Sequence, residues 1–107
     1  MSDFWIRQGD TSPAYEAILK DDKGKAVDIT GASVRFHMRA RGGETKVATS
    51  ATVVDGPAGK VSHGWSAEDT DTPGAFEAEF EVTYSDGTIE TYPNRRYLEV
   101  RITAEIA

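Results

Sequence analysis

The sequence predicts an all-β protein, an antiparallel β-sandwich of about seven to eight short strands. Apolar residues recur at every second position in several segments, which is typical of strands with one buried face. Turn residues, mainly glycine, proline and aspartate, separate these segments about every eight to twelve residues. A length of 107 residues suits one hydrophobic core. We therefore expect a single domain over residues 1–107.

The N-terminal third is expected to supply up to four strands. Residues 1–8 are predicted to form an N-terminal arm or an edge strand. A strand is predicted over residues 14–20, with a turn at residues 21–24 and a short strand at residues 27–29. Residues 33–39 alternate apolar and basic side chains, which predicts the next strand.

The middle and the end of the chain continue this pattern. Residues 51–54 and 60–65 are predicted to pair as a hairpin, because the loop between them contains proline and two glycines. Ser66 with Asp69 three positions later could begin one helical turn. The last strand is predicted over residues 97–106, where apolar and polar side chains alternate.

The clearest strand lies in GAFEAEFEVTYSDGT, residues 74–88. Apolar side chains occupy one face, and Glu77, Glu79 and Glu81 occupy the other, which predicts a solvent-facing row of carboxylates that would discourage edge pairing. The dipeptide Asp86-Gly87 predicts a two-residue hairpin of type I′. In that register Ser85 lies opposite Thr88, Tyr84 opposite Ile89 and Glu81 opposite Tyr92.

Composition opposes several classes of function. The formal net charge of −6 disfavours nucleic acid as a partner. The chain has no cysteine, which excludes disulfides, thiolate catalysis and cysteine-based zinc sites. No apolar run reaches the ~18 residues that would cross a bilayer. We expect no membrane association, and synthesis in a cytoplasm.

Candidate catalytic and metal-binding residues are weak. His37 and His63 lie in separate predicted strands, have no acidic residue at a motif spacing, and are expected at the surface or rim. The run EDTDT at residues 68–72 lacks the glycine and distal glutamate of an EF-hand loop. We therefore predict no enzyme, no cofactor and no metal site, and a small-molecule ligand is not expected.

Aromatic residues are more informative, because amphipathic aromatics are enriched in protein interfaces. Trp65 is expected in the core. The segment Phe4-Trp5-Ile6 is apolar on both faces of an extended chain, so one face needs a cover from elsewhere. Candidate interface residues are Phe4, Trp5, Ile6, Tyr92 and Tyr97, the two tyrosines being expected on or near the outer face.

Several motifs occur in an order that resembles the N-terminal domain of phage baseplate upper proteins. They are GDTSPAYEAIL, then ITGASVRFHM at residues 29–38, GKVSHGW at residues 59–65, GAFEAEFEVTYSDGT at residues 74–88, and YLEVRI. The resemblance extends over residues 9–106. It implies an immunoglobulin-like sandwich that binds other tail or baseplate proteins without catalysis.

The resemblance also sets the expected biology. It implies a structural protein of the virion tail or baseplate that assembles through subunit contacts and is a homo-oligomer in the particle. Because the sequence stops at Ala107 without a coiled coil or receptor-binding region, an adaptor or accessory role is expected. The alternative is a carbohydrate-binding sandwich that uses Trp5, Trp65 or Tyr97 as a stacking platform.

Overall fold

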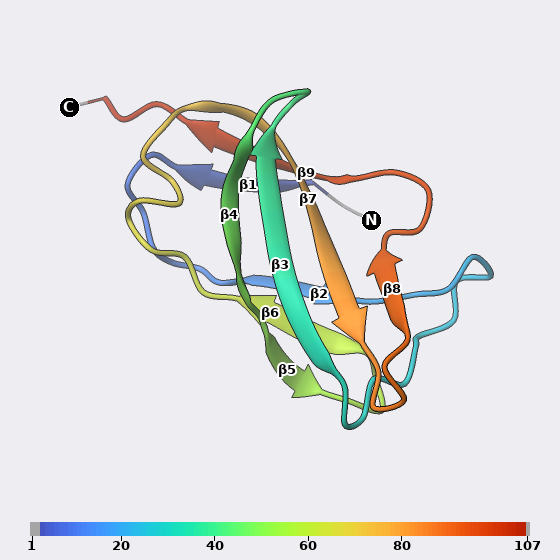
Figure 1. Cartoon of the computed structure of the whole chain (residues 1–107). Coiled ribbons are helices and arrows are strands. Elements are labelled where there is room, and N and C mark those ends of the chain that lie inside the picture. The colour runs from blue at the N-terminus through green and yellow to red at the C-terminus, as the bar shows by residue number, and fades with distance from the viewer. Residues whose placement is uncertain (1–2, 107) are drawn as a thin grey trace.

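A computed structural model of the chain describes residues 3–106 and contains nine strands and no helix in that range (Figure 1). The strands form a six-stranded and a three-stranded sheet, and the smaller sheet lies behind the larger one in Figure 1. Their bounds are β1 Phe4–Arg7, β2 Tyr15–Ile18, β3 Ser33–Ala40, β4 Thr45–Ser50, β5 Thr52–Asp55, β6 Lys60–His63, β7 Gly74–Thr83, β8 Ile89–Tyr92 and β9 Leu98–Thr103. The predicted all-β sandwich is confirmed.

The six-stranded sheet has the order β1-β9-β7-β3-β4, and β8 pairs with the distal half of β7. All adjacent strands in this sheet pair antiparallel except β1 and β9, which run parallel with Trp5 opposite Arg101. The N-terminal segment is therefore an edge strand. Strand β7 lies inside the sheet, between β9 and β3. The prediction that its glutamates discourage edge pairing is therefore wrong.

The three-stranded sheet has the order β2-β6-β5, with both pairings antiparallel. The chain passes from the larger sheet to the smaller one between β4 and β5, where Ala51 alone separates the two strands. Strand β2 is one edge of the smaller sheet and pairs with β6 from Tyr15 opposite His63 to Ile18 opposite Lys60.

The core fills the space between the two sheets and consists of the side chains of alternate residues, which point inward from each strand. In β7 every second residue from Phe76 to Val82 is buried. Phe36 at the centre is fully buried and lies 5.2 Å from the ring of Phe80 and 5.7 Å from the ring of Trp65, measured between ring centroids. Tyr15 from the smaller sheet completes this aromatic cluster, and burial raises the pKa of its hydroxyl to about 12. Trp65 is in the core, as expected.

Several expected elements differ in extent. Residues 45–50 form β4, which the sequence did not predict, because only Val47 of this edge strand is buried. Residues 27–29 form no strand, although Ala26 makes an isolated bridge to Lys20. The last strand ends at Thr103, and Ile106 beyond it is exposed.

The hairpin after β7 has a three-residue loop, so the predicted two-residue turn is wrong. Tyr84 N–H donates to the carbonyl of Thr88 at 2.8 Å, and Gly87 N–H donates to the carbonyl of Tyr84 at 2.9 Å. Only Gly87 has a positive φ here, whereas a type I′ turn needs two such residues. The Asp86 carboxylate instead accepts bonds from the backbone N–H and the hydroxyl of Thr88.

The longer loop shifts the register by one residue, so that Phe80 lies opposite Tyr92 and Val82 opposite Glu90. A shift of one residue moves every side chain of the second strand to the other face of the sheet. Tyr92 therefore faces the core.

The predicted turn at Ser66 is present as a single turn without a helix. Ser66 N–H donates to the Asp69 carboxylate at 3.0 Å, and Asp69 N–H donates to the Ser66 hydroxyl at 3.3 Å. This reciprocal pair is the arrangement of a capping box. It places the Asp69 carboxylate close to the end of β6.

Candidate protein-binding surface

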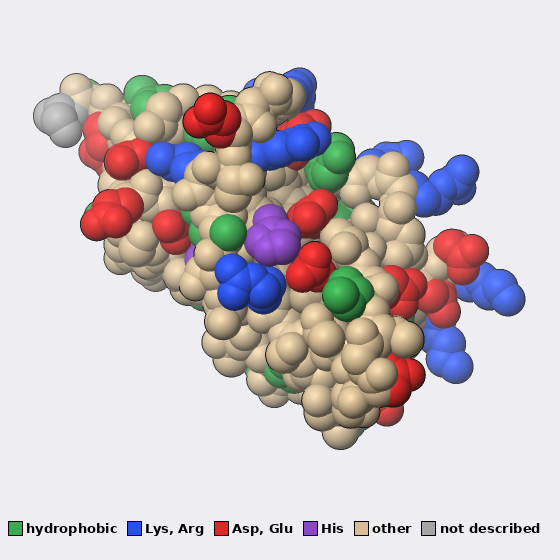
Figure 2. Space-filling view, in the orientation of Figure 1, with side chains coloured by type: hydrophobic (Ala, Val, Ile, Leu, Met, Phe, Trp, Pro, Cys, Tyr) green, Lys and Arg blue, Asp and Glu red, His purple; other side chains and the backbone are tan. Residues whose placement is uncertain are grey.

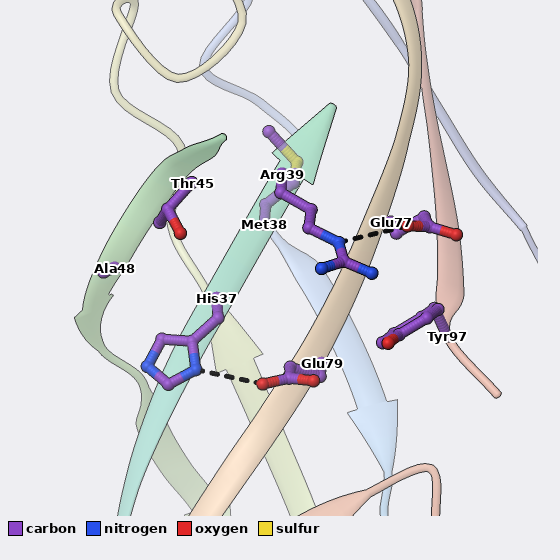
Figure 3. Close-up of a pocket in the computed structure, with 8 residues that line it drawn as sticks. All are labelled: His37, Met38, Arg39, Thr45, Ala48, Glu77, Glu79 and Tyr97. Atoms are coloured by element: carbon purple, nitrogen blue, oxygen red, sulfur yellow. Dashed lines mark hydrogen bonds and ion pairs between the residues drawn. The ribbon is translucent and has the colours of Figure 1, made fainter. Parts of the chain in front are cut away.

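Opposite charges are paired across β3 and β7 on the outer face of the six-stranded sheet. The strand register sets Arg35 opposite Glu81, His37 opposite Glu79 and Arg39 opposite Glu77. Nδ1 of His37 lies 3.2 Å from Oε2 of Glu79, and Nε of Arg39 donates to Oε1 of Glu77 at 3.1 Å (Figure 3). The register thus places a row of basic side chains beside the glutamate row on the neighbouring strand.

Tyr97 closes one end of this double row. Its ring lies under the guanidinium of Arg39, with Cζ 4.9 Å from the ring centroid, and Figure 3 shows it beside Glu79. Hydrogen bonding to Glu77 raises the pKa of Arg39, so this cation is fixed at all physiological pH values. A shallow pocket of about 260 Å³ lies between these side chains and β4.

A second arginine and aromatic pair lies at the β1 edge of the same face. The guanidinium of Arg101 lies over the ring of Trp5, 5.5 Å from its centroid. Arg101 also forms an ion pair with Glu99, its Nη2 lying 2.6 Å from Oε1, and Nη2 of Arg41 donates to the same carboxylate oxygen at 3.1 Å. One carboxylate therefore holds two arginines in place.

We refer to these residues together as the charged face. Figure 2 shows acidic and basic side chains and a histidine gathered over β3 and β7 on this side of the molecule. Its members are Trp5, Arg35, His37, Arg39, Arg41, Glu77, Glu79, Glu81, Tyr97, Glu99 and Arg101.

The structure divides the predicted interface residues into two groups. Trp5 is 60% exposed and Tyr97 is 47% exposed, and both lie on the charged face. Phe4 and Ile6 point the other way, toward the core, where Phe4 stacks 4.8 Å from the ring of Tyr15 and Ile6 is buried. This is the alternation expected of an extended segment.

Tyr92 does not lie on the outer face, so its expected position is wrong. Only 2% of the residue is exposed, because the hairpin register turns it inward beside Phe80. Its hydroxyl donates to Glu90 at 2.6 Å and lies 3.0 Å from the hydroxyl of Tyr84. Burial raises the pKa of Tyr92 most, and these hydrogen bonds raise it further.

His63 also departs from its expected position at the surface or rim. It is buried, its ring is stacked 4.2 Å from that of Phe36, and its Nε2 lies 3.0 Å from the Asp69 carboxylate. Burial lowers the pKa of His63 more than the contact with Asp69 raises it, so the ring is neutral at pH 7 and Nε2–H donates. His63 and Asp69 are six residues apart, and the turn at Ser66 brings them together. This spacing is not that of a known sequence motif.

The sequence pattern missed the pairing partners on the charged face. The alternation in β3 and β7 indicated which side chains face outward, but the partners are distant along the chain: His37 and Glu79 are 42 residues apart, and Arg39 and Glu77 are 38 residues apart. A signal was present, since Arg35, His37 and Arg39 repeat at the same period as the glutamates. Within residues 3–106, no group of three or more carboxylate or histidine side chains is placed to hold a metal ion.

Replacing Glu77 and Glu79 together by glutamine is expected to lower the free energy of unfolding by about 1 kcal/mol or less, because ion pairs at a partly exposed surface contribute little. Chemical denaturation measures this. The matched control is Glu44→Gln with Glu68→Gln, two exposed glutamates elsewhere, which should be neutral. A loss above about 2 kcal/mol would show that the paired rows are a main source of stability.

Comparison with known proteins identifies the family. Residues 3–93 match the BppU N-terminal domain, the N-terminal domain of the baseplate upper protein. The chain belongs to this family. The match begins at the edge strand β1 and ends before β9, whereas the sequence motifs resembled the family over residues 9–106.

Two solved structures show the same fold. The N-terminal domain of phage TP901-1 ORF48 is 16% identical, with a TM-score of 0.68 over 95% of this chain and 85% of that one. CopC from Methylosinus trichosporium OB3b is 13% identical, with a TM-score of 0.57 over 100% of this chain and 89% of that one. No curated protein matches the sequence.

Family membership establishes the general role. Members of the BppU N-terminal domain family are structural domains of the phage baseplate, so this chain has a structural role in a phage tail or baseplate and contacts other tail proteins there. Residues 3–106 include no helix of the length and apolar character needed to cross a membrane.

Proposed function

We propose that this domain is a non-catalytic adaptor or accessory component of the virion that binds a neighbouring tail protein through the charged face. The observation that carries this proposal is Trp5, a tryptophan 60% exposed on an edge strand and held by a cation–π contact with Arg101. Its synthesis in the cytoplasm of the bacterial host is part of the same proposal.

The chemistry of the face suits binding of a protein. Tryptophan, tyrosine and arginine are the residues that most often dominate interface energies, and here they occur as two adjacent stacks, Trp5 with Arg101 and Tyr97 with Arg39. The arginines are already held by Glu99 and Glu77, so little side-chain entropy is lost when a partner binds. The paired rows of β3 and β7 would then select the partner by charge.

The mixed sign of the charges also favours a protein over nucleic acid. Acidic and basic side chains alternate across the charged face, and the chain carries a net charge of −6, so a phosphate backbone finds no continuous positive surface. A sugar platform is less well supported, because Trp65 is buried and both exposed rings have one face occupied by an arginine.

Trp5→Ala tests the proposal. The isolated domain should stay folded, within about 1 kcal/mol of wild type, because most of this side chain is outside the core. Assembly with the tail partner should weaken by about 2 kcal/mol or more, as expected for an anchor residue. The measurements are a chemical melt of the purified variant and its incorporation into tails or particles, followed by sedimentation.

The matched control is Val54→Ala, which shortens an exposed apolar side chain on β5 of the other sheet. It should fold and assemble as wild type does. Normal assembly of the Trp5 variant would remove this surface from the interface, and an equal defect in the Val54 variant would show that assembly responds to any loss of apolar surface.

A further inference from the structure

Within residues 3–106, no strand pairs with the edge of β2 that faces away from β6, and this open edge is a second feature, separate from the charged face. Leu19 N–H donates to the carbonyl of Gly59, on the β6 side of the strand. Backbone groups of alternate residues point to opposite sides of a strand, so those of Glu16, Ile18 and Lys20 point away from β6. The returning segment at residues 25–27 does not block them, because it bonds to Leu19 and Asp21, on the β6 side.

The side chains along this edge are arranged about Ile18. Glu16 lies two residues before it and Lys20 two residues after it, all three on the outer face of the smaller sheet and all exposed. Ile18 is 43% exposed, which is high for an isoleucine in a strand. A groove of about 470 Å³ runs along the same edge between the two sheets, and its apolar wall is formed by Phe4, Tyr15 and Ala17.

This strand is complementary to a second copy of itself that runs antiparallel to it. In an antiparallel pairing centred on Ile18, a second copy would set Ile18 opposite its equivalent, Glu16 opposite Lys20 of the copy and Lys20 opposite Glu16 of the copy. Opposite charges directly across an antiparallel pair stabilise it, and like charges destabilise it. Lys60 of the same chain lies 3.8 Å from the Glu16 carboxylate. It is on β6, so it would remain on the side of Glu16 that faces away from the second copy.

We propose that β2 is a homotypic interface, at which two copies of this chain pair their smaller sheets edge to edge into one continuous six-stranded sheet. The added strand would bond to the backbone groups of Glu16, Ile18 and Lys20, which have no backbone partner among residues 3–106, and would lie across the groove beside Phe4. This contact is independent of the partner proposed for Trp5, since it uses the opposite sheet.

The strand is short, so the dimer is expected to be weak. A stable interface usually buries about 1,200 Å² or more, and pairing of one four-residue strand gives less. We therefore expect dimers at roughly 0.1–1 mM protein, the range of effective concentration that tethering inside an assembled particle supplies. At physiological salt the Debye length is ~8 Å, so the repulsion between the net charges of the two copies is screened. The attraction between Glu16 and Lys20 of the copy acts over a shorter distance and is retained.

The first experiment exchanges the charges. Sedimentation equilibrium is measured for wild type, Glu16→Lys, Lys20→Glu and an equimolar mixture of the two variants. Each variant alone places like charges opposite each other, and its dimer should dissociate about tenfold more readily than wild type. The mixture restores both opposite-charge pairs, and it should form heterodimers about as well as wild type forms homodimers.

Controls for this experiment are Glu68→Lys and Lys23→Glu, which make the same changes in charge at exposed positions away from β2. They should dimerise as wild type does, and melts should show all four variants folded. A wild type that stays monomeric at 1 mM, or a mixture that associates no better than either variant alone, would overturn the proposal. An extended strand from another protein would then be the remaining occupant of this edge.

The second experiment tests the register by crosslinking, which is clean because the chain has no cysteine of its own. Pairing residues in an antiparallel ladder lie about 5.5 Å apart between Cα atoms, within the span of a disulfide. Ile18→Cys should form a covalent dimer on mild oxidation, and Glu16→Cys should do so only when mixed with Lys20→Cys. Lys23→Cys is the exposed-thiol control, and equal crosslinking of all these variants would contradict the register.

Discussion

Gly59→Ala is expected to lower the free energy of unfolding by about 3 kcal/mol or more. Gly59 lies in the loop before β6 with φ of 69°, a conformation that costs energy for any residue with a Cβ. An added Cβ would also lie 2.6 Å from the carbonyl oxygen of Val27 and 3.0 Å from that of Leu19. Both neighbours are backbone atoms, so they cannot turn away as a side chain would.

Gly87→Ala is the matched control, because it isolates the cost of the backbone conformation. Gly87 has φ of 90°, but apart from Gly87 and its two neighbours in the chain, nothing lies within 4 Å of the position that a Cβ would occupy. Its loss should be about 1 kcal/mol. Chemical denaturation of both variants measures the difference. Equal losses would show that the loop can move away from Val27, and the close approach would then have no energetic weight.

Phe36→Ala is expected to cost about 3–5 kcal/mol of unfolding free energy. Phe36 is fully buried and contacts four aromatic rings, those of Tyr15, His63, Trp65 and Phe80. Truncation leaves a cavity among large, stiff rings that cannot close around it, which places the effect at the upper end of the usual range. A domain of this size is stable by only about 5–15 kcal/mol, so the variant should be partly unfolded when warmed.

Thermal and chemical melts measure this loss, and Phe36→Leu is the control. Leucine keeps most of the volume and should cost about 1.5 kcal/mol or less. If alanine and leucine have equal effects, the cavity is not the cause, and the specific ring contacts of Phe36 would be the source of the loss.

Alternation along the chain predicted the sandwich well, because it reports burial and needs no knowledge of distant residues. It placed β3 and β7 and the faces of both. It failed for β4, where Val47 is the single buried residue, Lys46 is half-buried and the others are exposed, so the strand leaves no period-two pattern. An edge strand of this kind is defined by its bonds to β3, which the local sequence does not encode.

The hairpin shows a different limit. Asp86-Gly87 is compatible with a two-residue loop and with a three-residue loop, and the bonds that Thr88 donates to the Asp86 carboxylate favour the longer one. The choice is small in energy, but it changes the face of every residue in β8. Tyr92 was consequently predicted on the outside, although it packs against the core.

Of the candidate site, the sequence proposed Trp5 and Tyr97 as interface residues, but it did not predict the arginines that contact them. Arg101 meets Trp5 only because β1 and β9, at opposite ends of the chain, lie side by side. Arg39 meets Tyr97 through the sheet order that brings β3 and β9 to either side of β7. Such contacts depend on topology, which the local sequence pattern does not determine.

The parallel pairing of β1 with β9 gives the domain a mechanical property. Since the two strands run in the same direction, a pull on the start of β1 against the end of β9 acts along the strands, in shear (Figure 1). The four register pairs from Phe4 with Val100 to Arg7 with Thr103 then share the load and must break together, whereas a hairpin pulled at its open end unzips one pair at a time. Tension applied between the start of β1 and the end of β9 would therefore load this pairing in shear, and it could not unzip the pairs one at a time.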